Sequence, residues 1–328
     1  MQQAVPEEDP PADFDAELAA NVSRAFWIEN RSKIEIADEF EISRFKVARL
    51  LEDARRYGMV HIEITEPKER LTRLADQVRA AFGLTEVALS SRSATSATGL
   101  AALGAVAAAY LQEHVPAGST IGLGWGRTLA EVVGHLAVGG PADVVQLAGG
   151  FAGSAGDFNG SSLVTEASVV LRGSAYVLHA PALVESSDAR ALLRADHTVA
   201  RTVARYGELD ALVTGVGVLS ANPCSPIYRG EVLSPSVHRE LRRWGVVGDA
   251  CCHFIDARGH VVDELAERST GISVEEIRST PLRIAVAGGA DKLVPLLAAL
   301  RSGMPNVVIT DVDTARMLLA ADGAGSTH

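Results

Sequence analysis

The sequence predicts two joined domains: a small all-α domain of the helix-turn-helix type, with or without a wing, and a larger α/β domain with a mostly parallel sheet. Three observations carry this prediction. The chain has 328 residues, 47% of them hydrophobic, which is more than one typical domain needs. Residues 33–51 have the apolar spacing of two short packed helices. From Arg70 onward, apolar strands alternate with glycine turns and helices, a pattern typical of a parallel sheet buried on both faces.

Charge and cysteine content narrow the possible functions. The net charge of −11 argues against nucleic-acid binding by the whole surface, yet cations outnumber acids within residues 44–56. The three cysteines form no CxxC pair, so we expect neither a disulfide framework nor a metal site. The acidic, proline-rich start differs from a secretory signal, and the longest apolar run is too short to span a membrane. We therefore expect a cytoplasmic protein that does not bind a membrane.

The predicted boundaries divide the chain into three parts. Residues 1–13 are expected to be a disordered tail, 14–66 the helix-turn-helix domain and 67–328 the α/β domain. Residues 61–65 alternate like a strand, which predicts a short β-wing, and Pro67 marks the hinge.

The helix-turn-helix prediction depends on a few residue types at fixed spacing. A helix is predicted over 14–29, followed by two more within 33–51. Ala37 is small enough for the two helices to approach closely, and Ser43 can cap the second because its hydroxyl accepts from a free backbone N–H. Gly58 is well placed for a left-handed C-cap. The apolar positions that pack the helices together are Ile36, Phe40, Ile42, Val47 and Leu50.

The second of these helices carries the residues expected to bind DNA. Packing and capping leave Arg44, Lys46 and Arg49 to point outward, and in this motif the outward face of the second helix enters the major groove. The alternative is a helix of the same fold whose arginines are merely solvated. The predicted DNA-binding residues are Ser43, Arg44, Phe45, Lys46 and Arg49.

In the α/β domain the chain is predicted to repeat strand, glycine turn and helix. The expected strands are 86–89, 119–124, 143–147, 175–178, 211–216, 250–255, 282–287 and 307–310. The main expected helices are 71–82, 98–111, 127–136, 187–196 and 291–300. Open parallel sheets bind ligands at the carboxyl ends of their strands, so the glycines there are candidates for a binding site.

The strongest candidate is the turn Gly124, Trp125, Gly126, Arg127 and Thr128. A strand, a glycine turn and a helix start together present free N–H groups and a positive dipole end to an anion. Arg127 adds a charge-assisted donor. The turn has neither a Walker ending nor GxGxxG spacing, so it predicts neither a P-loop nor a dinucleotide site. A tight corner with a surface arginine is the alternative.

A second glycine pair, Gly288 and Gly289, follows another predicted strand and precedes Lys292. A lysine in the first turn of a helix opposes the macrodipole unless an anion is near, which favours a phosphate partner over a solvated side chain. Asp249 could accept hydrogen bonds from sugar hydroxyls or simply form a turn. The weaker candidates for the same site are Gly149, Gly150, Gly215, Gly217, Arg229 and Asp249.

Seven sequence blocks occur in a characteristic order between about residues 18 and 320. They are SRFKVARLLEDARRYGMVHIEI, GLGWGRTL, QLAGG, LHAPALV, DALVTGVG, GVVGDACCHFIDARGHVVD and AVAGGADKLVPLLAALRSGMPNVVITDVDTARMLL. In this order the chain resembles the SorC family of sugar-responsive bacterial transcriptional regulators. The resemblance implies an effector domain related to sugar-phosphate isomerases and an oligomer whose operator affinity is set by a phosphorylated sugar. It implies that residues 124–128 and Lys292 hold the phosphate, while Asp249 and Arg229 line the sugar.

Two positions depart from the family pattern. Glu41 occupies the turn position where the helix-turn-helix usually has glycine, a place that favours φ > 0 and costs another residue about 1 kcal/mol. Some relatives are expected to hold an aldehyde effector through a lysine Schiff base, but this chain has no lysine between Lys68 and Lys292. We therefore expect non-covalent binding.

Two functions from different classes remain open. The first is a non-enzymatic regulator without a cofactor, a homodimer or homotetramer that binds operator DNA under the control of a sugar phosphate. The second is a sugar-phosphate isomerase with a DNA-binding extension. Isomerisation needs a general base and usually an acid beside it. Asp249 could be the base, but no second carboxylate or histidine can be paired with it from the sequence, so no catalytic residue is assigned.

Overall fold

The computed structural model describes residues 11, 14–60, 67–150, 159–219, 228, 233 and 235–325. The chain divides into two compact units, Met1–Ile64 and Thr65–His328. We call them the N-terminal and the C-terminal unit and describe each by itself.

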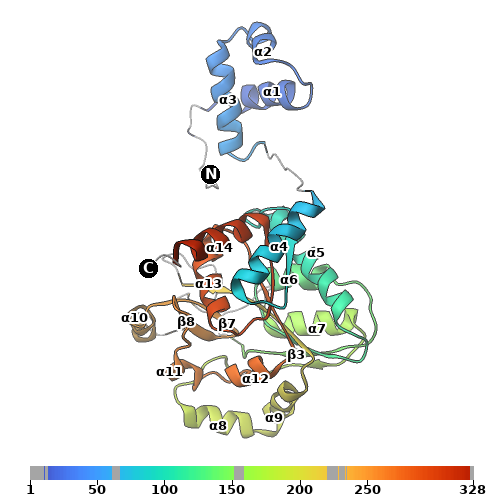
Figure 1. The fold of residues 1–328 in the computed structure, drawn as a ribbon, viewed down its shortest axis with the longest axis vertical. Helices are drawn as coiled ribbons and strands as arrows, with labels where there is room; N and C mark the ends of the chain where they lie inside the picture. The colour runs from blue at the N-terminus through green and yellow to red at the C-terminus, as the bar shows by residue number, and fades with distance from the viewer. Residues whose placement is uncertain are drawn as a thin grey trace. The chain divides into compact units, whose positions relative to one another are not determined.

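The N-terminal unit is a three-helix bundle (Figure 1). Its helices are α1 (Ala16–Trp27), α2 (Lys33–Glu39) and α3 (Arg44–Arg56). The predicted apolar positions pack together: Ile36, Val47 and Leu50 are buried, and Phe40 and Ile42 are partly buried against them. The prediction of a helix-turn-helix core is confirmed, whereas the predicted β-wing at 61–65 lies outside the described residues.

The caps and turns of this unit follow from its sequence. The Ser32 and Glu35 side chains form a capping box at α2, and Ser43 Oγ accepts the Lys46 N–H at 3.2 Å to cap α3. Glu41 has φ 50 in the turn between α2 and α3, and Gly58 has φ 71 after α3. The expected left-handed conformations at these two positions are therefore confirmed.

The C-terminal unit is built on a seven-stranded sheet whose pairings are all parallel, in the order β1-β10-β9-β5-β2-β3-β4. The strands are β1 (Glu86–Ser90), β2 (Thr120–Leu123), β3 (Asp143–Gln146), β4 (Ala175–Tyr176), β5 (Ala211–Gly215), β9 (Leu282–Val286) and β10 (Val307–Asp311). From β2 the chain moves outward to β3 and β4, and from β5 it moves the other way to β9 and β10. The boundary between β2 and β5 is thus the switch point at which such sheets bind ligands.

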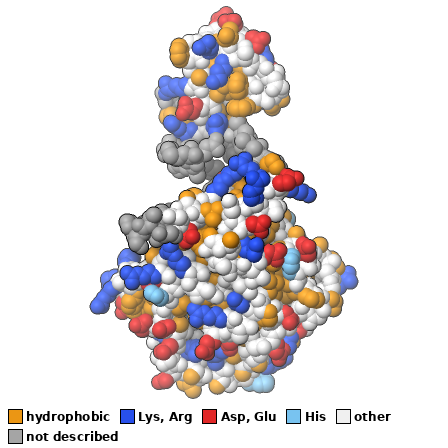
Figure 2. Space-filling model, viewed as in Figure 1, with side chains coloured by type: hydrophobic (Ala, Val, Ile, Leu, Met, Phe, Trp, Pro, Cys, Tyr) orange, Lys and Arg blue, Asp and Glu red, His pale blue; other side chains and the backbone are white. Residues whose placement is uncertain are grey.

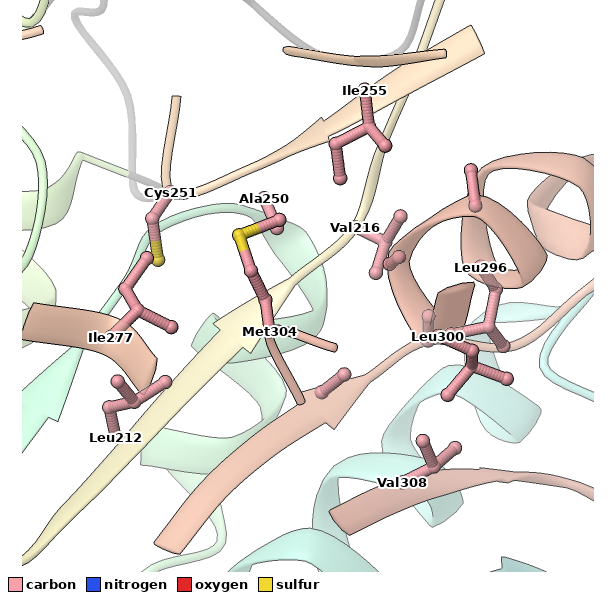
Figure 3. Close-up of a cluster of buried hydrophobic side chains, with 14 of the residues drawn as sticks. Leu212, Val216, Ala250, Cys251, Ile255, Ile277, Leu296, Leu300, Met304 and Val308 are labelled. Carbon is pink, nitrogen blue, oxygen red and sulfur yellow. The ribbon is translucent and has the colours of Figure 1, made fainter. Parts of the chain in front are cut away.

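Helices cover both faces of this sheet, and two apolar clusters fill the space beneath them. One cluster combines side chains of α5, α6 and α7 with the sheet, and the other combines α4, α12, α13 and α14 with the opposite face. Figure 3 shows Cys251, Ile277 and Met304 directed into this second cluster. The helices are α4 (Lys68–Phe82), α5 (Ala97–His114), α6 (Arg127–Gly134), α7 (Gly160–Val170), α8 (Ser187–Ala195), α9 (His197–Ala204), α10 (Pro235–Arg243), α11 (Asp263–Ala266), α12 (Val274–Ser279), α13 (Leu293–Arg301) and α14 (Val312–Gly325), with 3₁₀ turns η1 (Arg205–Glu208) and η3 (Ala290–Lys292).

The prediction of a single strand over 250–255 is wrong. The chain forms an antiparallel three-stranded sheet from β6 (Gly217–Val218), β7 (Val246–Ala250) and β8 (His253–Asp256). The hairpin between β7 and β8 turns at Cys251 and Cys252, whose φ angles are 51° and 65°. Two-residue hairpins of this type favour Asn-Gly or Gly-Gly, so two buried cysteines gave no turn signal.

Candidate functional site

The carboxyl ends of β2 and β5 lie side by side at the switch point. The predicted glycine turn, which begins at Gly124 after β2, therefore packs against the end of β5. The Gly124 N–H donates to the Val213 carbonyl at 2.9 Å. A Cβ atom on Gly124 would lie 3.4 Å from Thr214 Oγ1, and one on Gly215 would lie 3.8 Å from the Trp125 carbonyl oxygen. The turn after β2 therefore lies directly against the end of β5.

Helix α6 begins at this turn without a side-chain cap. Gly126 is its N-cap with φ 117, and a Cβ atom there would meet nothing within 4 Å. Arg127 is exposed and Thr128 is partly buried. By contrast, Ser96 caps α5 and Asn159 caps α7, the helices after β1 and β3. Helix α6 thus leaves its first-turn N–H groups without a side-chain cap, as an anion site requires, and η3 and α13 after β9 likewise have no side-chain cap.

The sequence predicts that the second glycine pair, Gly288 and Gly289, lies beside a phosphate, but the Gly289 N–H is bound within the protein. The Gly289 N–H donates to Asp311 Oδ2 at 2.9 Å and to Thr314 Oγ1 at 2.8 Å, so this N–H is already occupied. Asp311 is fully buried at the end of β10, too far along the chain for its contact with Gly289 to be expected from the sequence. Lys292 lies in η3, and its Nζ donates to the Val216 carbonyl at 2.8 Å.

Asp249 lies within β7 rather than at the end of a parallel strand, and it is buried. It pairs with Gly217 across the small sheet, where a Cβ atom on Gly217 would come 1.9 Å from Asp249 Oδ1. Burial raises the pKa of Asp249 to about 6, opposed by the Tyr228 hydroxyl, the Cys252 N–H and the positive charge of Lys292.

The Asp249 carboxylate keeps unused hydrogen-bonding capacity. Its Oδ2 accepts the Cys252 N–H at 3.3 Å. The Tyr228 hydroxyl interacts with this carboxylate closely enough to lower its pKa, although neither the hydroxyl nor Asp249 Oδ1 has a hydrogen bond of regular geometry to a described residue. Buried polar atoms in this condition are rare in native proteins, and a polar ligand can satisfy them.

The segment Gly215, Val216 and Gly217 links these groups. Gly215 contacts the turn at Trp125, Val216 accepts from Lys292, and Gly217 makes room for Asp249. The structure thus brings together the glycine turn after β2, the last lysine and the buried carboxylate, which are distant in sequence.

Of the remaining predicted site residues, Gly149 and Gly150 are not among the groups that meet at this segment. Gly149 packs against the backbone of residues 180–182, since its Cβ would lie 2.4 Å from the Ala180 carbonyl oxygen, and Gly150 exchanges backbone hydrogen bonds with the same segment. Packing explains Gly149, whereas a Cβ atom on Gly150 would meet nothing within 4 Å. Arg229 lies outside the described residues.

The predicted DNA-binding residues share the surface of α3. Arg44, Lys46 and Arg49 are exposed, and Phe45 is 84% exposed. Arg49 Nε lies 3.6 Å from Asp53 Oδ2, one turn further along the helix. In Figure 2, cationic and hydrophobic side chains lie interspersed on the visible face of the N-terminal unit.

Comparison with known proteins places the chain in a family. Residues 66–320 match the family model described as "Putative sugar-binding domain". The chain is 26% identical over 308 residues to the deoxyribonucleoside regulator of Bacillus subtilis (strain 168), covering 92% of this chain and 97% of that protein. It is 26% identical over 309 residues to the transcriptional regulator LsrR of Escherichia coli (strain K12), covering 92% and 94%.

The fold is also that of a solved regulator. The full-length sorbitol operon regulator SorC from Klebsiella pneumoniae superposes with a TM-score of 0.71 at 24% identity, covering 93% of this chain and 99% of that one. These three relatives are named as regulators, which supports the first of the two open functions over the isomerase. No helix in the described part of the chain has the length and apolar character needed to cross a membrane. Because the family match spans most of the chain, this protein belongs to the sugar-binding domain family, and the relatives described above are named as transcriptional regulators.

Proposed function

We propose that the protein binds operator DNA through α3 and that a phosphorylated sugar or sugar alcohol, bound beside β2 and β5, sets its affinity for that DNA. One observation carries the proposal. An uncapped helix start, Gly126 with Arg127, adjoins the same short segment as a buried carboxylate whose Oδ1 has no hydrogen bond of regular geometry. The first feature suits an anion and the second suits a hydroxyl donor, and a sugar phosphate has both.

Different residues bind the phosphate and the sugar of this ligand. The N–H groups at the start of α6, the helix dipole and the Arg127 guanidinium stabilise the phosphate. Asp249 accepts hydrogen bonds from sugar hydroxyls, and Lys292 adds positive charge beside it. Binding is non-covalent and needs no further cofactor.

Regulation requires more than one copy of the chain. Symmetric dimers bind two half-sites one or more helical turns apart, so the spacing of two α3 helices decides affinity. An effector that rotates the copies relative to each other changes operator affinity without touching the DNA. We infer a homodimer or a homotetramer on a palindromic operator.

The test uses the full-length protein, a DNA site obtained by in vitro selection, and the sugar phosphate that most raises the melting temperature. Arg127→Ala is expected to bind the DNA as the unchanged protein does but to need about 10–100 times more effector for the same response, because a hydrogen bond to a charged group contributes about 1.5–3 kcal/mol. The control is Arg201→Ala, which removes an exposed arginine from α9. An unaltered response in Arg127→Ala shows that the phosphate site is misplaced, and turnover of pentose or hexose phosphates shows that the protein is an isomerase.

A further inference from the structure

Phe45 is an aromatic side chain that the fold of the N-terminal unit does not use. It is 84% exposed, more than any other large apolar side chain in the described part of the chain. Burying a phenylalanine stabilises a fold, and at this exposure Phe45 contributes little of that stabilisation. Single exposed apolar residues are common, so its meaning depends on where it lies.

Phe45 lies at the centre of the outward face of α3. Counting about 100° per residue, it points roughly 170° away from the mean direction of the core side chains. Arg49 follows one turn later on the same stripe, roughly 150° from the core on the other side. Arg44 and Lys46 project to the two flanks, at roughly 70° and 90°. The core side chains used for this direction are Val47, Leu50, Leu51 and Ala54.

This placement separates two kinds of DNA contact. The N-terminal residues of a recognition helix meet base edges, and Ser43 caps α3 immediately before them. Flanking cations reach the phosphates on either side of the groove, and these contacts position the protein without specifying sequence. Phe45 and Arg49 are therefore left to meet the bases.

A phenyl ring can neither donate nor accept a regular hydrogen bond, so it needs an apolar partner. In the major groove the thymine 5-methyl group is that partner. Apolar wedges that unstack bases belong to minor-groove binding, which a helix lying in the major groove does not use. We propose that Phe45 contacts thymine methyl groups and so selects thymine in each half-site. This inference rests on the proposed operator binding by α3.

The experiment removes the methyl group from the DNA and the ring from the protein. An operator is obtained from random duplexes by in vitro selection with the full-length protein. Each thymine is then replaced in turn by deoxyuridine, which keeps base pairing and lacks only the methyl. Dissociation constants are measured at one salt concentration for the unchanged protein, for Phe45→Ala and for the control Ile28→Ala, which truncates a 72% exposed side chain at the end of α1.

We expect deoxyuridine to weaken binding about fourfold at one or two thymines per half-site, because a buried methyl contributes about 0.8 kcal/mol. Phe45→Ala is expected to bind the thymine and the deoxyuridine operators with equal affinity, whereas Ile28→Ala keeps the fourfold difference between them. Both variants keep the melting temperature, since both side chains are exposed.

Three results overturn the proposal: deoxyuridine changes affinity nowhere, its effect persists in Phe45→Ala, or Phe45→Ala changes the oligomeric state in sedimentation and thus marks a protein contact. If no DNA sequence is enriched at all, the proposed DNA binding fails first and this inference with it.

Discussion

The buried carboxylate of Asp249 predicts an unusual dependence of stability on pH. Its side chain is 3% exposed, and burial raises its pKa from 3.8 to about 6. The folded protein therefore holds this proton more tightly than the unfolded chain does. This group therefore stabilises the folded protein most below pH 3.8, and the stabilisation is lost as the pH rises through 6. Well above pH 6, the free energy of unfolding is about 3 kcal/mol lower than it is below pH 3.8, because the buried carboxylate is then charged.

Asp249→Asn isolates this contribution, because asparagine keeps the shape and cannot titrate. We expect the free energy of unfolding of the unchanged protein to fall relative to that of the variant by about 1.4 kcal/mol between pH 5 and pH 8. Other titrating groups, including buried His253, are common to both proteins and cancel in the difference.

Urea unfolding at the two pH values, followed by tryptophan fluorescence, measures this difference. The control is Asp188→Asn, which removes an exposed carboxylate from α8. Parallel pH profiles for the unchanged protein and Asp249→Asn would refute the reasoning, because they would show that Asp249 ionises equally easily in the folded and unfolded chain.

Three further predictions concern single positions. Glu41→Gly should stabilise the N-terminal unit by about 1 kcal/mol in thermal unfolding, because Glu41 has φ 50; an equal gain from Glu41→Ala would contradict this explanation. Gly217→Ala should lower the melting temperature and abolish effector binding in titration calorimetry, because the new Cβ would lie 1.9 Å from Asp249 Oδ1, whereas Gly207→Ala meets no atom within 4 Å and should bind normally. In a Cys224→Ser background, Cys251 and Cys252 should react with a thiol reagent only when the protein unfolds. Burial raises the pKa of both thiols, that of Cys251 to about 12, and rapid labelling of the native protein would contradict this prediction.

Local signals made much of the fold predictable. Apolar strands separated by helices and glycine turns indicated the parallel sheet, and the spacing around Ala37 and Val47 indicated the helix-turn-helix. Positive φ could be expected at Glu41 and Gly58 from their positions in the turn and after a helix. Each of these features depends on residues close together in the chain, so its cause is visible in the sequence.

The rest depends on contacts between distant residues. The run from Val246 to Asp256 has two cysteines and neither glycine nor asparagine at its centre, so the sequence carried no signal for the hairpin that buries Asp249. Gly289 was linked to phosphate because it follows a strand, but its N–H is bound by Asp311, which lies 22 residues further along the chain. The convergence of Trp125, Lys292 and Asp249 on the segment after β5 required the strand order.

We propose that the carboxyl ends of β2 and β5, together with Asp249 of the small sheet, bind an anion and a polyol in one ligand. The most direct measurement is titration calorimetry of the full-length protein with one sugar phosphate and with its unphosphorylated parent. The account predicts that loss of the phosphate weakens binding by about 100-fold or more, because several charge-assisted hydrogen bonds of about 1.5–3 kcal/mol are lost together. Equal affinity for the two compounds would contradict it.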